Sequence, residues 1–469
     1  MPYDLDAPDS LSITSLQTAY SSGSTTPVDV VRALHSRIES YSAKDPAVWI
    51  DRVPFDDLLA AAEALQAKHE GKEKPALYGV PFSVKNSIDV KGYKTTLACP
   101  TFAYVPDKTA PVVERVLEAG GLFVGTTNLD QFATGLVGHR SPYGTPRCVK
   151  DSEYISGGSS SGSAVSVGAG LCSFSIATDT AGSTRVPASL NGLIGLKPTL
   201  GTLSTVGLIP ACKTADCITV LAKNVDDAEA ACATMRAYGE EDAYARSPLE
   251  LAGLASLPRL TSREGGVRFA TPPQEMMSVL SDEYAKLWEA AVEKLEKAGS
   301  GLARAERFDY TPFDSAEKML YGSSIVAQRS VAFDSYLQEH GYSSLHPVIA
   351  TILSTPTGSA IDAYKDLFQL ADYKRKCEVQ FRDNIDVLVV PSTTVHWKVK
   401  EVDEDPIERN KRLGKFTHFV NLVDLCAVSV PAGTWTNPNG NELPFGVTFI
   451  AMPGRDEDIL ELARRFQSL

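Results

Sequence analysis

The stretch from residue 156 to residue 198 constrains the fold more than any other part of the chain. It opens on Ser-Gly-Gly-Ser-Ser-Ser-Gly-Ser and ends on Gly-Leu-Lys-Pro. A Gly/Ser-rich run of this kind is often a flexible linker. Here, however, residues 164–177 are small and apolar, which favours a buried helix and then a buried strand over Leu171 to Ala177. Since a linker would not continue into a core, we expect the run to be ordered.

Two serines in this stretch are candidate nucleophiles. Residues 158–162 match the pattern G-x-S-x-G, in which Ser160 would attack with the help of a His and an Asp. That turn needs a strand directly before the serine, but residues 150–156 are polar, and the seven histidines have no convincing catalytic setting. Ser183 instead follows Ala181 and Gly182 just after the buried strand, where several backbone N–H groups can point to one place. The pattern therefore favours Ser183.

A serine nucleophile needs a base, and Lys85 is the best candidate. Residues 79–85 read Gly-Val-Pro-Phe-Ser-Val-Lys, an apolar strand that ends in a cation. Desolvation lowers the pKa of a buried lysine, so that its neutral amine can replace histidine as the base. An isolated lysine on a strand is structural in most proteins, and on these residues alone that interpretation stays open.

These segments together resemble the amidase signature family, whose pattern is a Lys, a Gly-Gly-Ser-Ser run and a Gly-Ser turn followed by Gly-Leu-Lys-Pro. In that family the nucleophile lies 24 positions after a bridging serine, as Ser183 does after Ser159. The resemblance implies Lys85 as the base, Ser159 as the bridging serine in a cis peptide bond, and Ser183 as the nucleophile. It also implies an oxyanion hole made by the backbone amides of Thr180, Ala181, Gly182 and Ser183.

Within the family, residues 130–138, 320–329 and 419–425 resemble allophanate hydrolases, and the likeness runs over nearly the whole chain. In those enzymes a Tyr and an Arg eight residues apart bind the substrate, which implies Tyr321 and Arg329 here. A glycine before the serine core also contacts substrate there, and Gly135 is the best match. A planar guanidinium can hold a carboxylate through two parallel hydrogen bonds. The implied substrate is a small anionic amide, allophanate first, whose terminal C–N bond is cleaved with release of ammonia.

Five positions depart from the allophanate hydrolase pattern, so another short carboxylate with an amide or ureido group stays open as the substrate. They are Thr184, His139, Ser324, Ile325 and Gln328. An amidotransferase subunit that amidates misacylated tRNA with partner subunits is a second interpretation. A catalytically dead amidase fold used as a binding module is a third. It would need a broken triad, but Lys85, Ser159 and Ser183 are all present.

The order of elements predicts an α/β fold. A strand at 79–85, a helix at 107–120 and a strand at 122–125 alternate, which favours a layered architecture. With the resemblance, this implies the amidase-signature fold, a large twisted mixed sheet covered by helices on both faces. Residues 239–258 are expected to be a polar, weakly ordered connection, residues 416–425 a helix, and residues 428–433 and 444–450 central strands.

The length of 469 residues can bury one large core, so we expect a single amidase domain over 1–469 with no additional C-terminal domain. Its expected parts are N-terminal helices over 10–70, a signature core over about 76–220, substrate-covering helices over about 280–380, and closing strands and a helix over 385–469.

Composition indicates which kinds of partner we do not expect the protein to bind and in which cellular compartment we expect it. A net charge of −13 argues against nonspecific binding to nucleic acid or anionic lipid. We expect a cytoplasmic protein, because the chain has neither a membrane span nor a signal peptide. The eight scattered cysteines fit reduced thiols and no structural zinc or other metal. The implied chemistry needs no cofactor, and the resemblance implies a homodimer.

Overall fold

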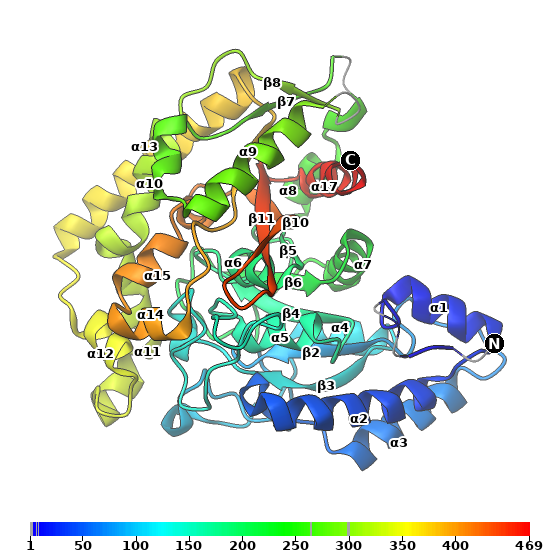
Figure 1. Ribbon diagram of the computed structural model, residues 1–469. Helices are drawn as coiled ribbons and strands as arrows, with labels where there is room; N and C mark the ends of the chain where they lie inside the picture. Colours follow the sequence, from blue (N-terminus) through cyan, green and yellow to red (C-terminus); the bar gives the residue numbers. More distant parts are fainter. Residues whose placement is uncertain (1–2, 6, 8, 263–264, 298–300) are drawn as a thin grey trace.

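The computed structural model describes residues 3–5, 7, 9–262, 265–297 and 301–469, and its described strands form one 11-stranded sheet (Figure 1). The order across the sheet is β1-β3-β2-β4-β6-β5-β10-β11-β9-β7-β8. Four neighbouring pairs, β2–β3, β2–β4, β7–β8 and β7–β9, are parallel and the rest are antiparallel. The predicted mixed α/β sheet is therefore confirmed. The strands are β1 Trp49–Arg52, β2 Pro81–Lys85, β3 Leu122–Thr127, β4 Phe174–Asp179, β5 Ile194–Lys197, β6 Cys217–Ala222, β7 Val267–Ala270, β8 Leu302–Arg304, β9 Val387–Pro391, β10 Cys426–Thr436 and β11 Glu442–Ala451.

Helices surround the sheet, and several begin where the sequence places a cap. Ser12 caps the first helix, and Thr26 with Asp29 forms a capping box at the second, which has Pro27 as its first residue. Ser281 caps α9, where its side chain accepts from the backbone N–H of Tyr284. The helices are α1 Ile13–Ser22, α2 Pro27–Lys44, α3 Phe55–Lys68, α4 Pro111–Glu118, α5 Ser161–Gly168, α6 Arg185–Asn191, α7 Val225–Met235, α8 Pro248–Ala255, α9 Asp282–Glu296, α10 Thr311–Gly322, α11 Ala327–His340, α12 Pro347–Ser354, α13 Ala360–Asp383, α14 Val399–Glu404, α15 Glu408–Leu413, α16 His418–Leu422 and α17 Asp456–Ser468.

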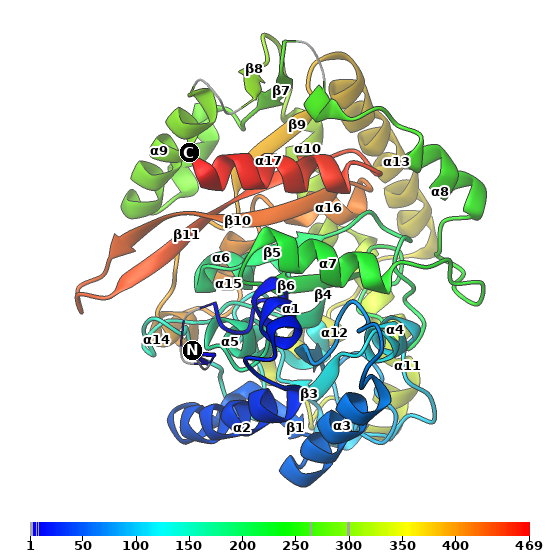
Figure 2. The ribbon, with the colours of Figure 1, turned by 90° about the vertical axis from the view of Figure 1, so that its right-hand side faces the viewer.

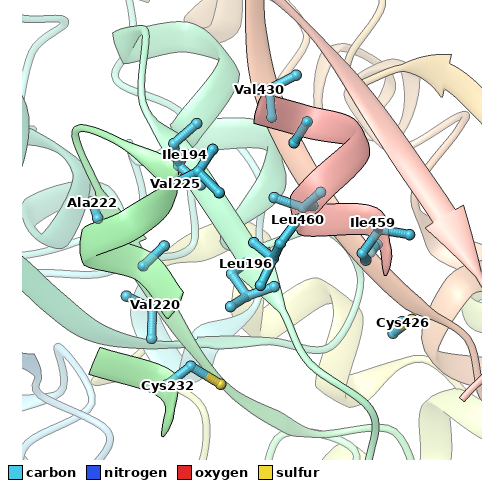
Figure 3. Packing of buried hydrophobic residues seen from close by; sticks show 14 of the residues in the cluster. Ile194, Leu196, Val220, Ala222, Val225, Cys232, Cys426, Val430, Ile459 and Leu460 are labelled. Atoms are coloured by element: carbon cyan, nitrogen blue, oxygen red, sulfur yellow. The ribbon is translucent and has the colours of Figure 1, made fainter. Parts of the chain in front are cut away.

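Strand β5 shows how both faces of the sheet are covered. Ile194 and Leu196 pack in one apolar cluster with Val225 of α7 and with residues of α17 (Figure 3). Gly195 points to the other face, where an added Cβ atom would lie 2.7 Å from Cβ of Ala188 in α6. Successive strand residues face opposite sides, so α7 and α17 cover one face while α5 and α6 pack together on the other (Figure 2). Helices on both faces are thus confirmed.

The structure corrects the sequence-based expectation in places. Residues 239–258, predicted to be a weakly ordered connection, contain α8, which Ser247 and Glu250 begin with a capping box. Strands β1, β5 and β6 and helix α6 were not predicted. Helix α16 is shorter than the predicted helix over 416–425 because only residues 418–422 are helical. Strands β10 and β11 extend beyond their predicted bounds and pair as an antiparallel hairpin within the sheet.

Helices α10 to α13 lie together beside the sheet, on the left in Figure 1. Helix α10 contacts both α13 and α16, and α16 in turn contacts β10. These helices bring Tyr321 and Arg329 toward the sheet. Within the described part of the chain, no helix has the length and apolarity needed to cross a bilayer.

Candidate active site

Lys85 is the last residue of β2, which lies between β3 and β4 in parallel register. Its side chain is fully buried. The ammonium nitrogen Nζ donates hydrogen bonds to Ser159 Oγ at 2.8 Å and to Thr178 Oγ1 at 2.7 Å. Burial lowers the pKa of Lys85 to about 7, although the negative charges of nearby Asp130 and Asp179 act in the opposite direction. Near neutral pH, a large fraction of this amine is therefore unprotonated and can accept a proton.

Ser159 lies in the loop before α5, and its peptide bond to Gly158 is cis, as the resemblance implied. The loop is tightly enclosed, because a Cβ atom at Gly158 would overlap Asp130 Oδ2 and lie 2.6 Å from the amide nitrogen of Gly138. The backbone N–H of Asp130 donates to the carbonyl of Ser159 at 3.0 Å. These contacts fix the backbone that carries the Ser159 hydroxyl next to Lys85.

Ser183 lies on the turn over residues 180–184, between β4 and α6. This turn is here called the serine turn or the 180–184 turn. Ser183 has 3% of its surface exposed. Its carbonyl accepts the N–H of Ser160 at 3.2 Å, which joins this turn to the loop of the bridging serine. Among the described residues, the amides of Thr180, Ala181 and Ser183 have no hydrogen-bond acceptor. The amide of Gly182 instead donates to Asp179 Oδ1 at 2.9 Å. Of the four amides predicted to form an oxyanion hole, that of Gly182 therefore already has a partner in this conformation.

A buried ion pair supports the 180–184 turn. Arg185 donates to both carboxylate oxygens of Asp179, from Nη2 at 2.7 Å and from Nε at 3.0 Å, and neither side chain is exposed. Burial alone would raise the pKa of Asp179, but the Arg185 charge and hydrogen bonds hold that pKa below its usual value. Asp179 therefore stays ionised and can keep the Gly182 amide in place.

Tyr321 of α10 and Arg329 of α11 meet in the structure. Arg329 is buried, and its Nη2 atom donates to the Tyr321 hydroxyl at 3.3 Å while Nη1 donates to Thr134 Oγ1 at 2.7 Å. Gly135 follows Thr134, and a Cβ atom there would lie 2.5 Å from Asp130 Oδ2, which leaves no room for a side chain. The three residues predicted to bind substrate, Tyr321, Arg329 and Gly135, thus lie close together, and the region they form is here called the substrate corner.

This corner adjoins the serine turn. Ala181 packs in an apolar cluster with Leu320 and Ile325, and Tyr321 packs against the same cluster. The positive charge of Arg329 also contributes to lowering the pKa of Lys85. This corner therefore places a buried cation beside the cluster of Ala181, which lies two residues before Ser183.

The five departures from the allophanate hydrolase pattern fall into two groups. Thr184 and Ile325 lie at the site: Thr184 Oγ1 bonds the carbonyl of Thr178 at 3.1 Å, and Ile325 shares the cluster of Ala181. The other three make polar contacts with residues that are not part of the 180–184 turn. His139 contacts Thr145 and Asp403, Gln328 contacts Thr214, and the Ser324 amide contacts Asp366.

Sequence reasoning missed several side chains that touch the predicted site residues. Thr178 accepts from Lys85, and Thr134 accepts from Arg329. Thr178 lies inside the stretch 156–198 and Thr134 inside the stretch 130–138, both of which were singled out from the sequence, so their positions could have indicated a place near the site. Asp216, which accepts from the Thr180 hydroxyl at 2.5 Å, and Thr417, which donates to the Ala181 carbonyl at 2.6 Å, carried no such signal.

The eight cysteines are free and buried. Among the described residues, no three His, Cys, Asp or Glu side chains are grouped so that they could hold a metal ion.

A comparison with protein families finds that residues 29–460 match the family model named Amidase. The chain belongs to the amidase family. This membership confirms the resemblance to the amidase signature enzymes, and it places the segments of Lys85, Ser159 and Ser183 inside the matched region.

Relatives of this amidase include urea amidolyases. It is 41% identical over 448 residues to a urea amidolyase of Lachancea kluyveri, covering 95% of this chain and 24% of the relative. The chain thus spans about a quarter of the length of the urea amidolyases it matches. It is 30% identical to a glutamyl-tRNA(Gln) amidotransferase subunit of Symbiobacterium thermophilum, covering 98% of this chain and 96% of the relative.

Among solved structures, an allophanate hydrolase of Kluyveromyces lactis superimposes on this amidase with a TM-score of 0.85. The two are 38% identical, and the match covers 97% of this chain and 72% of that one. The predicted amidase-signature fold and the predicted likeness to allophanate hydrolases are therefore confirmed.

Proposed function

We propose that this amidase hydrolyses the terminal amide of a small, carboxylate-bearing urea derivative, allophanate above all, and releases ammonia. The observation that carries the proposal is the 2.8 Å hydrogen bond from Lys85 Nζ to Ser159 Oγ, made by a buried lysine whose pKa is about 7. Near pH 7 about half of such lysine side chains are unprotonated. A lysine in this state, hydrogen-bonded to a serine hydroxyl, is suited to act as a general base. The likeness to allophanate hydrolase supports the choice of substrate.

In the proposed reaction, Ser183 Oγ attacks the amide carbonyl carbon. Its proton passes to Ser159, whose own hydroxyl proton passes to neutral Lys85. As the C–N bond breaks, the proton returns through Ser159 to the departing nitrogen, which leaves as ammonia. Water then attacks the acyl carbon, gives up its proton along the same path, and releases Ser183. The chemistry needs no metal or organic cofactor.

The proposed oxyanion hole consists of the amides of Thr180, Ala181 and Ser183, which have no acceptor among the described residues. They adjoin the nucleophile, and backbone donors held in a dry site stabilise a developing negative charge without reorganisation. Loss of one such donor costs about 3 to 4 kcal/mol in the barrier. The Gly182 amide keeps its bond to Asp179 and serves to hold the turn.

Arg329 and Tyr321 are proposed to bind the substrate carboxylate, beside Gly135. The guanidinium is buried and already held from one side by Thr134, so it can present its remaining N–H groups in a fixed orientation. A carboxylate there pairs with a charge that is already desolvated. Selection for anionic amides follows from this pairing.

The test is ammonia release from a panel of allophanate, biuret, malonamate, urea and a neutral aliphatic amide, with Ser183→Ala as the blank. We expect allophanate to be strongly preferred and Ser183→Ala to be inactive. A preference for the neutral amide would reject the assigned substrate while leaving the serine chemistry intact. Equal turnover by Ser183→Ala would reject the mechanism itself.

The amidotransferase interpretation keeps a specific support, the 30% identity to an amidotransferase subunit over nearly its full length. It predicts glutaminase activity only in the presence of partner subunits. Ammonia release from glutamine, measured with the purified chain alone and again after addition of the partner subunits, separates the two functions, because only an amidotransferase subunit gains glutaminase activity from the partners.

We further propose that the protein acts in the cytoplasm as a homodimer that pairs through its N-terminal helices. Free, buried cysteines are typical of a reducing compartment, and all eight are free. Light scattering coupled to gel filtration tests the dimer, and a monomer mass would reject it.

A further inference from the structure

Residues 414–421, here called the 414–421 segment, contact both parts of the site but have no step in the proposed chemistry. The segment includes the start of α16. Thr417 Oγ1 donates to the carbonyl of Ala181 at 2.6 Å, and the ring of His418 lies edge-on to the ring of Tyr321, with centroids 5.3 Å apart. Asn421 Nδ2 donates to the carbonyl of Asp179 at 2.7 Å. One short segment thus touches the serine turn and the substrate corner.

Thr417 fixes the peptide unit that precedes the nucleophile. The carbonyl of Ala181 accepts from Thr417, and the N–H of the same peptide, which belongs to Gly182, donates to Asp179 at 2.9 Å. Because a peptide unit is planar, holding both of its ends fixes its orientation. Only the φ and ψ angles of Gly182 separate that plane from the amide of Ser183. The direction of the Ser183 amide therefore depends on the Thr417 hydroxyl.

The packing around Gly182 supports this role. Gly182 has a φ of 117°, a conformation that favours glycine. A Cβ atom at Gly182 would overlap Thr417 Oγ1 and lie 2.7 Å from Thr417 Cβ. The threonine side chain therefore occupies the space above the glycine, and the turn is enclosed on that side.

His418 holds Tyr321 in a similar way. Glu317 and Tyr321 lie four residues apart on α10, hence on one face of the helix, and His418 Nδ1 lies 3.4 Å from Glu317 Oε1. The imidazole is 2% exposed, and among the described residues its Nε2 atom has no hydrogen-bond partner. Nε2 packs against Gly414, where a Cβ atom would overlap it. The ring is thus confined between Gly414, Glu317 and Tyr321.

We infer that the 414–421 segment aligns the two halves of the site, with Thr417 as a positioning residue for Ser183 and His418 as a positioning residue for Tyr321. The inference rests on the proposed function, in which Ser183 attacks and Tyr321 with Arg329 binds the substrate. Neither Thr417 nor His418 exchanges a proton with the substrate. Their effects should therefore separate, because one acts on the attacking group and the other on binding.

The experiment compares Thr417→Val, which removes the hydroxyl but keeps the shape, with Thr417→Ser, which keeps the hydroxyl. Thr202→Val is the matched control, because the Thr202 hydroxyl likewise donates to a buried backbone carbonyl, that of Thr199 at 2.7 Å. We expect Thr417→Val to lower kcat about tenfold with little change in KM, a fraction of the loss seen when an oxyanion donor is removed outright. Thr417→Ser and Thr202→Val should keep kcat near that of the native chain.

His418→Leu tests the second half. We expect it to raise KM for allophanate about tenfold while kcat changes much less, because binding through Tyr321 is weakened and Ser183 is untouched. A loss confined to kcat, or no change at all, would overturn the role of His418. A general loss of folding would appear in the melting temperature, which is measured for every variant.

Labelling of Ser183 by phenylmethanesulfonyl fluoride gives a readout that needs no substrate. Thr417→Val should slow the labelling about as much as it lowers kcat, and Thr417→Ser should restore it. Native labelling and native kcat in Thr417→Val would overturn the inference, as would equal loss in Thr417→Ser. If Thr417→Val does not fold, Thr417→Cys carries the same expectation, because a thiol is a weak donor. Failure of the proposed function looks different: Ser183→Ala would retain turnover, or no amide of the panel would be cleaved.

Discussion

Replacement of Lys85 by Met tests the buried base through stability, independently of any substrate. Met has a similar length and no charge, so it removes the cost of burying the amine. Burial lowers the pKa of Lys85 from its ordinary 10.5 to about 7, whereas the unfolded chain keeps the ordinary value. Between pH 7 and 10.5 the unfolded state therefore binds more protons than the folded state. In that window the contribution of Lys85 to the free energy of unfolding must rise with pH.

The size of the effect follows from the shift. One pKa unit corresponds to about 1.4 kcal/mol, so the whole shift corresponds to about 5 kcal/mol. This amount is the cost of burying the charged amine. It lowers the free energy of unfolding in full below pH 7 and not at all above pH 10.5. From pH 7 to pH 9, the unfolding free energy of the native chain should gain about 2 kcal/mol relative to Lys85→Met. The hydrogen bonds to Ser159 and Thr178 that the variant loses add an offset that does not change with pH.

The assay is urea unfolding followed by tryptophan fluorescence, for both proteins, at several values between pH 7 and pH 9. Comparing the two chains cancels the titration of all other groups. A difference that stays flat over this range would refute a depressed pKa, and with it a base that is neutral near pH 7. Native activity should rise with pH up to about 7 and then level off, since the free amine is the active form. Lys85→Met should be inactive at every pH.

Three further substitutions test other parts of the site. Arg329→Lys should raise KM for allophanate about tenfold or more and leave a neutral amide nearly unchanged, because an ammonium cannot reproduce the guanidinium fork; equal changes for both substrates would remove its assigned role. Arg185→Met should lower the unfolding free energy by about 3 to 5 kcal/mol, because it leaves the buried carboxylate of Asp179 uncompensated; urea unfolding measures this, and a change below about 1 kcal/mol would contradict it. Gly182→Ala should suppress both kcat and Ser183 labelling, since the new Cβ atom overlaps Thr417; native labelling would show that the turn adapts.

Much of the fold was predictable because its signals are local. The strand of Lys85, the helix after it and the parallel strand beyond appear in the sequence as alternating apolar segments, and the structure pairs β2 with β3 in parallel. The start of α8 carried a usable signal as well. Ser247, Pro248 and Glu250 form the pattern of a capping box with proline at the first helical position, which the polar composition around it obscured. Strand β6 is likewise an apolar run that could have been recognised.

The contacts that hold the site together were not predictable in this way. The Gly182 amide could contribute to an oxyanion hole by its position, but it donates to Asp179, whose carboxylate Arg185 fixes. Thr417 reaches the same turn from more than 230 residues away along the chain. Nothing local marks such a pair, because the partners meet only when helix α16 packs beside the turn. Order and spacing located the candidate reacting groups, whereas tertiary packing decides which backbone donors remain free.

The surroundings of Lys85 explain why its amine can be neutral in a site that contains several carboxylates. Asp179 is neutralised by Arg185, and the oxygens of Asp130 accept the backbone amides of Gly138 and Arg140. Within the described part of the chain, no carboxylate lies within ion-pair distance of Lys85, whose side-chain partners are two hydroxyls. A hydroxyl accepts from an ammonium and equally donates to a free amine, so it favours the charged form far less than a carboxylate would. Burial therefore dominates, and the lysine is left able to accept the proton of a serine.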